Sequence, residues 1–431
     1  MYETQPNAAR ERAILVAVKL PHSDGWPPED TLEELALLAD TAGADVLETM
    51  IQVRKQLDPA TLIGAGKVAE VAQRVQELSA NLVIFDDDLT PAQARNLERA
   101  IGAKILDRSG LILDIFARRA KSKEAKTQVE LAQLKYLLPR LTRQWTHLSR
   151  QEGGIGTRGP GETQLEVDRR RVRERIANLS AIMKDIANRR EVRRKKREGE
   201  FTVALVGYTN TGKSTLLNAL SRAEIYTGNK LFTTLDPTTR AVHLNGGKKV
   251  LITDTVGLIR KLPHHLIASF HSTLEELVEV DLLLHVIDVS HEKFEEQMKA
   301  VTDVLEDLGA HTRPFMLVFN KIDKVAHLPN LLARLGREYP EAVFISALRE
   351  RGLEQLAEGI LRHFEQQMVE LTLHLPLSNP KLLSQIYAAS EVLERQDHPR
   401  GVSLRVKLRR EDALRLQKKL SWCSPQGPHK K

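Results

Sequence analysis

Residues 201–220 have the sequence FTVALVGYTNTGKSTLLNAL, and this stretch decides the fold. An apolar run at 202–206 predicts a buried strand, the pattern Gly-x-x-x-x-Gly-Lys-Ser follows, and a helix-forming run comes next. Backbone N–H groups of such a loop, together with the positive end of the following helix, bind phosphate groups. We expect Lys213 to reach the β- and γ-phosphates and the Ser214 hydroxyl to bind Mg²⁺. The stretch predicts an α/β P-loop domain whose nucleotide-binding residues are Gly207, Tyr208, Thr209, Asn210, Thr211, Gly212, Lys213 and Ser214.

A second motif, Asp254-Thr255-Val256-Gly257, follows an apolar strand predicted at 249–253. We expect the carboxylate of Asp254 to hold Mg²⁺ through a water molecule and the N–H of Gly257 to meet the γ-phosphate. Ligands of α/β sheets bind at the carboxyl ends of the strands, where both motifs lie. The two motifs together indicate a nucleoside triphosphate site that contains Mg²⁺.

Two later motifs indicate which base is bound. Asn320-Lys321-Ile322-Asp323 follows a strand predicted at 315–319, and Ser346-Ala347-Leu348 ends the next strand. A carboxylate accepts both the N1–H and the exocyclic N2–H₂ of guanine, a pattern that adenine lacks. A buried Asp323 would therefore be left unpaired by ATP and would reject it. A backbone N–H of the last motif can donate to guanine O6. The ordered set of four motifs predicts GTP and GDP as the ligands.

Composition bounds the class of protein. The chain has 431 residues, which at roughly 100–200 residues per domain suggests two to four domains. The single cysteine, Cys423, excludes a disulfide framework and a cysteine-based zinc site. The sequence contains no run of roughly 18 apolar residues and no apolar segment near its start. We therefore expect a cytoplasmic protein without stable membrane insertion, and we expect a monomer.

Predicted strands and helices divide the chain into four parts. Residues 1–115 are expected to form a small α/β domain, 116–198 a basic helical hairpin, 199–366 the P-loop domain with a mainly parallel sheet, and 367–431 a small α+β module. In the first part we expect strands at 13–20, 46–53, 81–85 and 104–106 and helices at 29–42, 64–79 and 90–102, the last with Thr90 as its N-cap. In the third part we expect strands at 202–206, 249–253, 282–288, 315–319 and 342–345. In the last part we expect a strand from 370, a helix at 381–393, a strand at 401–408 and a helix at 411–420.

Two features of the first part could suggest a site, and both have a structural interpretation. Asp86, Asp87 and Asp88 follow a strand, where metal ligands can lie, but no partner histidine or glutamate cluster is visible, which favours a turn and helix cap. Gly64-x-Gly66-Lys67 opens a predicted helix but lacks the third glycine of a dinucleotide fingerprint, which favours close packing.

Residues 116–198 carry two apolar stripes at heptad-like spacing. Between them, residues 151–164 (QEGGIGTRGPGETQ) contain five glycines and a proline, which no helix tolerates. We expect an antiparallel hairpin with a mobile loop at its tip and a kink at Pro139 in the first arm, with a plain linker as the alternative. The stripes consist of Leu131, Leu134, Leu138, Leu141, Trp145 and Leu148, and of Val172, Ile176, Leu179, Met183 and Ile186.

The basic charge of the chain is concentrated in the second arm. The net charge is +7, yet residues 169–197 alone contain 13 Lys or Arg residues against 3 acidic ones. A local basic face indicates contact with phosphate groups, and a solvated helix face is the alternative. The candidate RNA-binding residues are Arg158, Arg169, Arg170, Arg171 and Arg173.

These motifs resemble those of a known family. Residues 232–240, FTTLDPTTR, resemble switch I of the Obg–HflX branch of translational-type GTPases. The stretch GGIGTRGPGETQLEVDRRR at 153–171, together with IGAGKV at 63–68, is similar to the HflX family of ribosome-associated GTPases. The resemblance covers nearly the whole chain and is weakest over 367–431. It implies that nucleotide contacts come also from Phe232, Thr233, Thr234, Leu235 and Asp236.

The same resemblance implies a function. Members of the HflX family are GTPases that bind the large ribosomal subunit, and some split stalled ribosomes as a stress response. By the same resemblance, Thr234 would bind Mg²⁺ only when the γ-phosphate is present. The hypothesis is therefore a GTPase whose GTP-bound state docks on ribosomal RNA and is released by hydrolysis. Two alternatives remain: a GTP-gated RNA-modification or RNA-remodelling factor, and a nucleotide-regulated protein-binding module.

One departure from Ras-like sequences affects catalysis. Leu258 follows Gly257, where many small GTPases carry the glutamine that orients water. We therefore expect slow intrinsic hydrolysis that the ribosome stimulates. Asn210 resembles the asparagine that binds K⁺ in GTPases lacking this glutamine, although asparagine also suits a turn with positive φ. The candidate catalytic residues are Lys213, Thr234, Gly257 and Asn210, with Mg²⁺ as cofactor and K⁺ as a second candidate cation.

Overall fold

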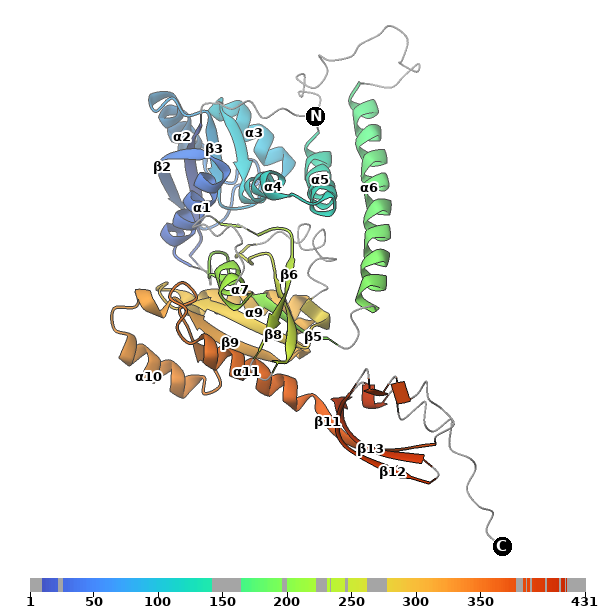
Figure 1. The fold of residues 1–431 in the computed structure, drawn as a ribbon. Coiled ribbons are helices and arrows are strands. Elements are labelled where there is room, and N and C mark those ends of the chain that lie inside the picture. Colours follow the sequence, from blue (N-terminus) through green and yellow to red (C-terminus); the bar gives the residue numbers. More distant parts are fainter. Residues whose placement is uncertain are drawn as a thin grey trace.

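In the computed structural model the N-terminal α/β domain and the P-loop domain lie against each other, a long helix runs beside the N-terminal domain, and the C-terminal module lies at the far end (Figure 1). The described residues are 10–21, 26–141, 164–195, 200–221, 231–232, 234–244, 247–261, 277–376, 383–384, 386–387, 390–399, 401–410, 412–414 and 416. Arg158, Thr233, Trp145, Leu148 and the loop at 151–163 lie outside them.

The N-terminal domain contains a four-stranded parallel sheet in the order β2-β1-β3-β4. Strand β3 is buried along its whole length, as expected for a parallel sheet covered on both faces. Helix α3 begins after Thr90, whose hydroxyl accepts the N–H of Gln93 at 3.2 Å in a capping box, so the predicted N-cap is confirmed. The elements are β1 (Glu11–Lys19), α1 (Pro28–Ala42), β2 (Ala44–Val53), α2 (Ala65–Glu77), β3 (Leu82–Phe85), α3 (Pro91–Ile101), β4 (Lys104–Asp107) and α4 (Arg108–Arg119).

Of the two glycines at the start of α2, Gly64 and Gly66, only Gly64 lies close to neighbouring atoms. A Cβ on Gly64 would lie 2.5 Å from Nη1 of Arg54, and the N–H of Gly64 donates to Oε1 of Gln52 at 2.9 Å. Gly66 faces open space. The predicted close approach therefore holds for Gly64 and is wrong for Gly66.

Helices α5 (Lys123–Leu137) and α6 (Gln164–Lys195) pack against each other (Figure 1). The apolar stripe of α6 is its less exposed face, and Leu179 within it is only 2% exposed. A bidentate pair between Arg175 and Glu130, at 2.8 and 3.0 Å, links the two helices. Pro139 lies in the short turn η1 (Leu138–Arg140) that ends the first helix, so it terminates a helix where we predicted a kink, because proline lacks the N–H donor. No helix in the described ranges is both long and apolar enough to cross a membrane.

The P-loop domain is built on a six-stranded sheet in the order β10-β9-β8-β5-β7-β6. All neighbouring strands pair in parallel except β6 with β7, which confirms the mainly parallel α/β fold. The elements are β5 (Phe201–Val206), α7 (Lys213–Ser221), β6 (Thr238–His243), β7 (Lys249–Asp254), β8 (Leu282–Asp288), α9 (Phe294–Asp307), η4 (Ala310–Thr312), β9 (Phe315–Asn320), η5 (Ile322–Lys324), α10 (Leu328–Glu338), β10 (Val343–Phe344) and α11 (Leu353–Gln366).

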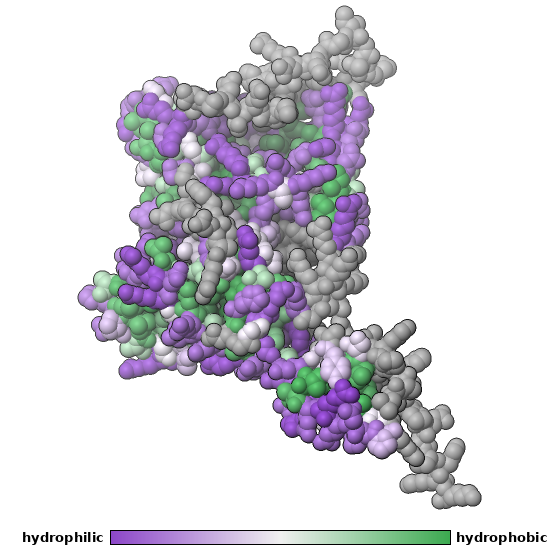
Figure 2. All heavy atoms as spheres, viewed as in Figure 1, coloured by the Kyte–Doolittle hydropathy of each residue, from purple (hydrophilic) through white to green (hydrophobic). Residues whose placement is uncertain are grey.

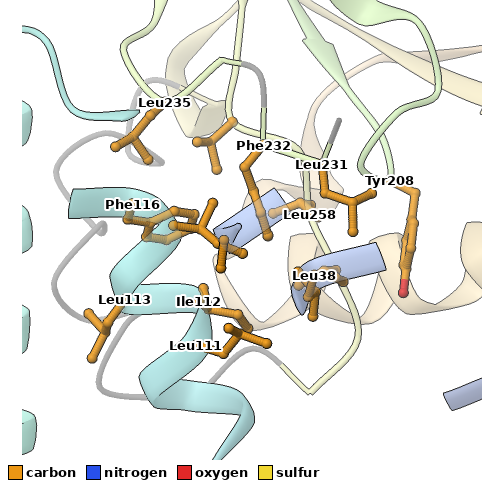
Figure 3. Packing of buried hydrophobic residues seen from close by; sticks show 14 of the residues in the cluster. Leu38, Leu111, Ile112, Leu113, Phe116, Tyr208, Leu231, Phe232, Leu235 and Leu258 are labelled. Carbon is orange, nitrogen blue, oxygen red and sulfur yellow. The ribbon is translucent and has the colours of Figure 1, made fainter. Parts of the chain in front are cut away.

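One hydrophobic cluster runs through the junction of the two domains. It joins residues of α1, α4 and α5 to the P-loop residue Tyr208 and to two further groups of residues in the P-loop domain. These groups are Leu231, Phe232 and Leu235, and Val256, Leu258 and Ile259. Figure 3 shows Phe116 of α4 beside Phe232, with Leu258 and Leu231 close by. The rings of Phe116 and Phe232 meet edge to face, with centroids 4.8 Å apart. The two domains therefore share one core.

The C-terminal module is a three-stranded antiparallel sheet, β11-β13-β12, with strands β11 (Met368–Pro376), β12 (Glu391–His398) and β13 (Gly401–Arg409). The predicted helix at 381–393 is wrong at its end, because residues 391–393 belong to β12. The turn before Gly401 brings β12 back onto β13 as a hairpin. Arg409 joins the module to the P-loop domain through an ion pair with Asp281 at 2.6 Å.

Candidate nucleotide site

The P-loop connects β5 to α7, and its glycines are required by close contacts. Gly207 has φ 154° and Gly212 has φ 93°, both in the region that favours glycine. A Cβ on Gly207 would collide with the carbonyl oxygen of Val286, and one on Gly212 would collide with the amide of Asn320. The loop is held further by the N–H of Thr209, which donates to the carbonyl of Leu258 at 2.8 Å. Neighbouring strands therefore fix the loop that the sequence predicts as the phosphate cradle.

Lys213 is buried at the first position of α7. Its ammonium donates to the carbonyl oxygens of Gly207 and Tyr208, at 3.0 and 2.7 Å. Burial lowers the pKa of Lys213 to about 8, although Asp254 favours the charged form. A cation held at the loop carbonyls beside a helix N-terminus can bind the phosphates of a nucleotide.

Ser214, Thr234 and Asp254 bring three oxygen ligands together. The Ser214 hydroxyl donates to Oδ2 of Asp254 at 2.6 Å and lies 2.7 Å from the Thr234 hydroxyl, which is 3.0 Å from the same carboxylate oxygen. Burial raises the pKa of Asp254, and its second oxygen, Oδ1, is buried without a hydrogen-bonding partner. Magnesium prefers oxygen ligands in such a compact set. These residues therefore fit a Mg²⁺ ion.

Gly257 lies against the far side of the same loop. A Cβ there would be 2.9 Å from Cα of Thr209 and 3.2 Å from Nζ of Lys213, so only glycine brings the backbone this close. The hydroxyl of Thr209 is buried and has no partner. The cleft is lined by Thr209, Asn210, Gly212, Lys213, Ser214, Thr215, Phe232, Thr234, Thr255 and Gly257, of which Thr215 was not predicted.

The two base-recognition motifs are joined to the P-loop by hydrogen bonds. The amide of Asn320 donates to the carbonyl of Thr211 at 2.8 Å and its oxygen accepts the N–H of Ala347 at 3.0 Å. Lys321 donates to the carbonyl of Asn210 at 2.7 Å. These contacts bring together the motifs that were predicted to hold the base.

Asp323 is positioned by a neighbour of the last motif. Its Oδ1 accepts the hydroxyl of the buried Ser346 at 2.5 Å. Asp323 itself is exposed, because η5 carries it to the rim of the sheet, so the expectation of a buried carboxylate is wrong. Leu348 is also exposed, at 69%.

Two residues predicted as nucleotide contacts, Leu235 and Val256, are buried in the cluster shared by the domains. Thr255 lines the cleft, and its hydroxyl donates to the carbonyl of Leu205 at 2.6 Å. Phe232 belongs to both the cluster and the cleft. Leu258 is 2% exposed and packs in the cluster, and it is not among the residues that line the cleft.

Comparison with known proteins agrees with this geometry. Family models described as GTP-binding GTPase N-terminal, GTP-binding GTPase Middle Region, 50S ribosome-binding GTPase and HflX C-terminal domain match residues 29–117, 119–197, 202–321 and 332–429. A GTPase HflX of Caldanaerobacter subterraneus subsp. tengcongensis is 46% identical over 95% of this chain and 93% of its own. The chain belongs to the HflX family of GTPases.

Two further proteins are similar to the chain. The GTPase HflX of Escherichia coli K12 is 42% identical over 95% of this chain and 96% of its own. A solved GTP-binding protein of Sulfolobus solfataricus in complex with GDP is 26% identical over 83% of this chain and 99% of its own, with a TM-score of 0.42. The chain is thus a GTP hydrolase that binds GTP and GDP, as its four motifs predicted.

This HflX-family GTPase also has a polar network between its N-terminal domain and its P-loop domain, which was not predicted from the sequence. Glu34 of α1 accepts hydrogen bonds from Tyr208 of the P-loop and from the fully buried Arg108. Arg108 in turn donates to Asp86 at 2.9 Å. Burial opposes the charge on Arg108, but Glu34 and Asp86 outweigh it and raise its pKa. No local pattern signals these partners, because they are far apart in the sequence.

The aspartate run after β3 takes part in the same network. Lys261, which follows the Asp254 motif, binds Asp86 at 2.6 Å and Asp87 at 2.7 Å. The predicted use of the run as a helix cap is wrong, because Thr90 caps α3. Asp86 and Asp87 therefore link the N-terminal domain to the P-loop domain through Lys261.

The basic residues of α6 differ in their surroundings. Arg169 donates to the carbonyl of Leu141 at 2.7 Å and is partly buried. Arg170, Arg171 and Arg173 are exposed. Hydrophilic side chains gather along α6 on the face shown in Figure 2. Arg169 therefore has a structural contact, whereas Arg171 and Arg173 present their charge to solvent.

Proposed function

We propose that this GTPase acts on the large ribosomal subunit and separates stalled ribosomes in its GTP-bound state. The observation that carries the proposal is the exposed basic face of α6, which includes Arg171 and Arg173 and lies on a helix packed against α5. The family model that matches residues 202–321 is described as a 50S ribosome-binding GTPase, which favours the same partner. Basic residues on a helix bind RNA through its phosphates.

Magnesium would be held by Ser214, Thr234 and, through water, Asp254. When bound, the ion neutralises charge on the β- and γ-phosphates. Lys213 would contact the same phosphates, and the N–H of Gly257 would donate to the γ-phosphate. Thr234 reaches this group from switch I, so GTP orders switch I through Thr234 and loss of the γ-phosphate releases it. The ordered state docks on RNA, and hydrolysis ends the contact.

The test is sedimentation of ribosomes with the full-length protein and a non-hydrolysable GTP analogue. We expect co-sedimentation with the large subunit and loss of intact ribosomes from the gradient. Binding without loss of intact ribosomes would overturn splitting and retain docking. Preferential binding to free RNA would favour an RNA-modification or RNA-remodelling factor. Preferential binding to another protein would favour a nucleotide-regulated protein-binding module.

The basic face is tested by Arg171→Ala with Arg173→Ala. We expect weaker ribosome binding and a log–log salt slope reduced by about two, since each phosphate contact contributes about one. The charge-matched control is Lys299→Ala with Arg337→Ala, which removes two exposed cations from α9 and α10. An unchanged salt slope in the α6 variant would mean that this face is only solvated.

We also propose that a K⁺ ion binds at Asn210 and assists hydrolysis in place of the water-orienting glutamine that this chain lacks. Asn210 lines the cleft, and its φ of 60° satisfies the requirement of the turn as well. A cation there can stabilise transition-state charge. Hydrolysis in K⁺ should exceed that in Na⁺, and Asn210→Ala should remove the difference while GDP binding is retained. Equal rates in both salts, with and without ribosomes, would sink the idea.

A further inference from the structure

A carboxylate of switch I lies at the N-terminus of the hairpin helix α5. Asp236 accepts the backbone N–H of Lys121 at 3.0 Å and that of Ser122 at 3.1 Å, and it also accepts the hydroxyl of Ser122. Ser122 is the N-cap of α5, because its hydroxyl oxygen accepts the N–H of Ala125 at 3.0 Å. Lys121 and Ser122 come just before the first helical residue, Lys123, and a carboxylate is favoured at a helix N-terminus. Asp236 thus holds the N-cap residue, and Ser122 in turn caps the helix.

Apolar contacts also hold this stretch of switch I, residues 232–236, in place. Phe232 packs edge to face on Phe116 of α4, and Leu235 is buried in the shared cluster (Figure 3). Phe232 and Asp236 therefore contact helices outside the P-loop domain, and Leu235 is buried in the cluster to which those helices contribute. Switch I is fixed here by the N-terminal half of the chain.

Thr234 lies two residues before Asp236, so the anchor and the Mg²⁺ ligand are at most about 7 Å apart along the backbone. The hydroxyl of Thr234 is within 3.0 Å of both Ser214 and Asp254. A shift of Asp236 away from α5 would therefore move Thr234 from this group.

We propose that Ser122 and the N-terminus of α5 are positioning groups for GTP hydrolysis, acting through Asp236 to hold Thr234 at the metal site. The three hydrogen bonds to one carboxylate and the short connection to Thr234 carry this inference. It does not rest on the proposed action on ribosomes. A contact that favours the GTP-bound arrangement is reciprocal: the triphosphate strengthens the junction between switch I and α5 by the same factor by which the junction favours the triphosphate.

The test compares Ser122→Ala and Asp236→Asn with two matched variants in the full-length protein. Thr90→Ala removes the N-cap of α3, in the N-terminal domain and away from switch I, and reports the general effect of losing a cap. Ser122→Thr keeps the hydroxyl and should restore wild-type behaviour. The readouts are the affinities for GDP and for a non-hydrolysable GTP analogue, and kcat for hydrolysis without ribosomes.

We expect Ser122→Ala and Asp236→Asn each to lower the preference for the GTP analogue over GDP by about three- to tenfold, since hydrogen bonds to charged groups are among the stronger ones. Affinity for GDP should stay unchanged in Ser122→Ala, kcat should fall in both single variants, and the double variant should be no worse than the single ones. An unchanged preference in both variants overturns the proposal, as does an equal loss in Thr90→Ala.

A second measurement needs no variant. Amide hydrogen exchange at Lys121 and Ser122 should be slower in the wild-type protein with the GTP analogue than with GDP, because Asp236 accepts both N–H groups when switch I is ordered. Equal exchange with the two nucleotides would overturn the proposal. Ribosome binding takes no part in either experiment, so failure here leaves the proposed function intact.

Discussion

Leu258 occupies the position at which many small GTPases carry a water-orienting glutamine, and its side chain is used for packing. It is 2% exposed in the cluster that joins the two domains, together with Phe232 (Figure 3). A side chain buried there does not reach the cleft. The residue therefore contributes to the junction between domains, and the geometry of the attacking water depends on other groups.

Replacing Leu258 by Gln should lower stability without raising the hydrolysis rate. An amide without a partner in this apolar cluster costs about 1–3 kcal/mol. Thermal unfolding should show the loss, and Leu258→Met should show much less because it nearly conserves volume. A faster rate in Leu258→Gln at unchanged stability would mean that residue 258 reaches the nucleotide.

Lys213 gives nucleotide binding a pH dependence. Burial lowers its pKa to about 8, and contact with phosphate anions favours the charged form. Above pH about 8, GDP binding therefore requires uptake of a proton by Lys213. The affinity for GDP should fall as the pH rises, by a factor that approaches about tenfold per pH unit. Titrations from about pH 7 to about pH 9 should show a plateau and then a decline. Lys213→Arg should flatten the decline, because arginine stays charged; a decline that persists in this variant would assign it to another group.

At the scale of elements, the α5–α6 pair shows how an apolar stripe determines packing. Leu179 is buried between the helices, whereas Ile182, three residues further, is 40% exposed. The heptad-like spacing distinguishes the two positions, because Leu179 lies on the apolar stripe of α6 and Ile182 lies beside it.

Leu179→Ala should destabilise the hairpin by about 2–4 kcal/mol, since it leaves a cavity at the contact. Ile182→Ala is the matched control and should cost much less. Amide exchange along α5 and α6 measures the difference. Equal effects of the two substitutions would show that the stripe does not form the contact surface.

Two strands were not predicted, and both lie at sheet edges. Strand β12 is almost fully exposed and shows no alternation of buried and exposed residues, and its Glu-Val-Leu-Glu-Arg stretch suits a helix equally well. Its strand form comes from backbone pairing with β13. Strand β6 is likewise mostly exposed and is set by its pairing with β7. The buried strand β8 is mostly apolar and was predicted with its bounds.

At the scale of the whole molecule, the N-terminal domain and the P-loop domain form one body. They share the hydrophobic cluster around Phe116 and Phe232. The polar network that includes Glu34, Arg108 and Lys261 also links the two domains. The sequence predicted the nucleotide motifs because each lies within a few consecutive residues. It could not predict the junction, because Glu34 and Tyr208 become neighbours only in the folded chain.

The two domains should unfold together. Because they share a core, scanning calorimetry should show one transition for both, and GDP should raise its temperature as a ligand of the folded state. Amides of β1 and β8 should gain protection in parallel when GDP binds. Two separate transitions, with only one shifted by GDP, would contradict a common core. Phe232→Ala, which removes one of the paired rings, should lower the common transition or divide it.

The junction also constrains how such a protein can change over evolutionary time. Asp86 and Lys261 meet across it, as do Glu34 and Tyr208. A chimaera that joined the first 120 or so residues of one relative to the remainder of another would leave buried charges without partners wherever these pairs differ, at a cost of roughly several kcal/mol. Substitutions at the two sides should therefore be inherited in pairs, and the N-terminal domain and the GTPase domain should descend as one unit that recombination rarely separates.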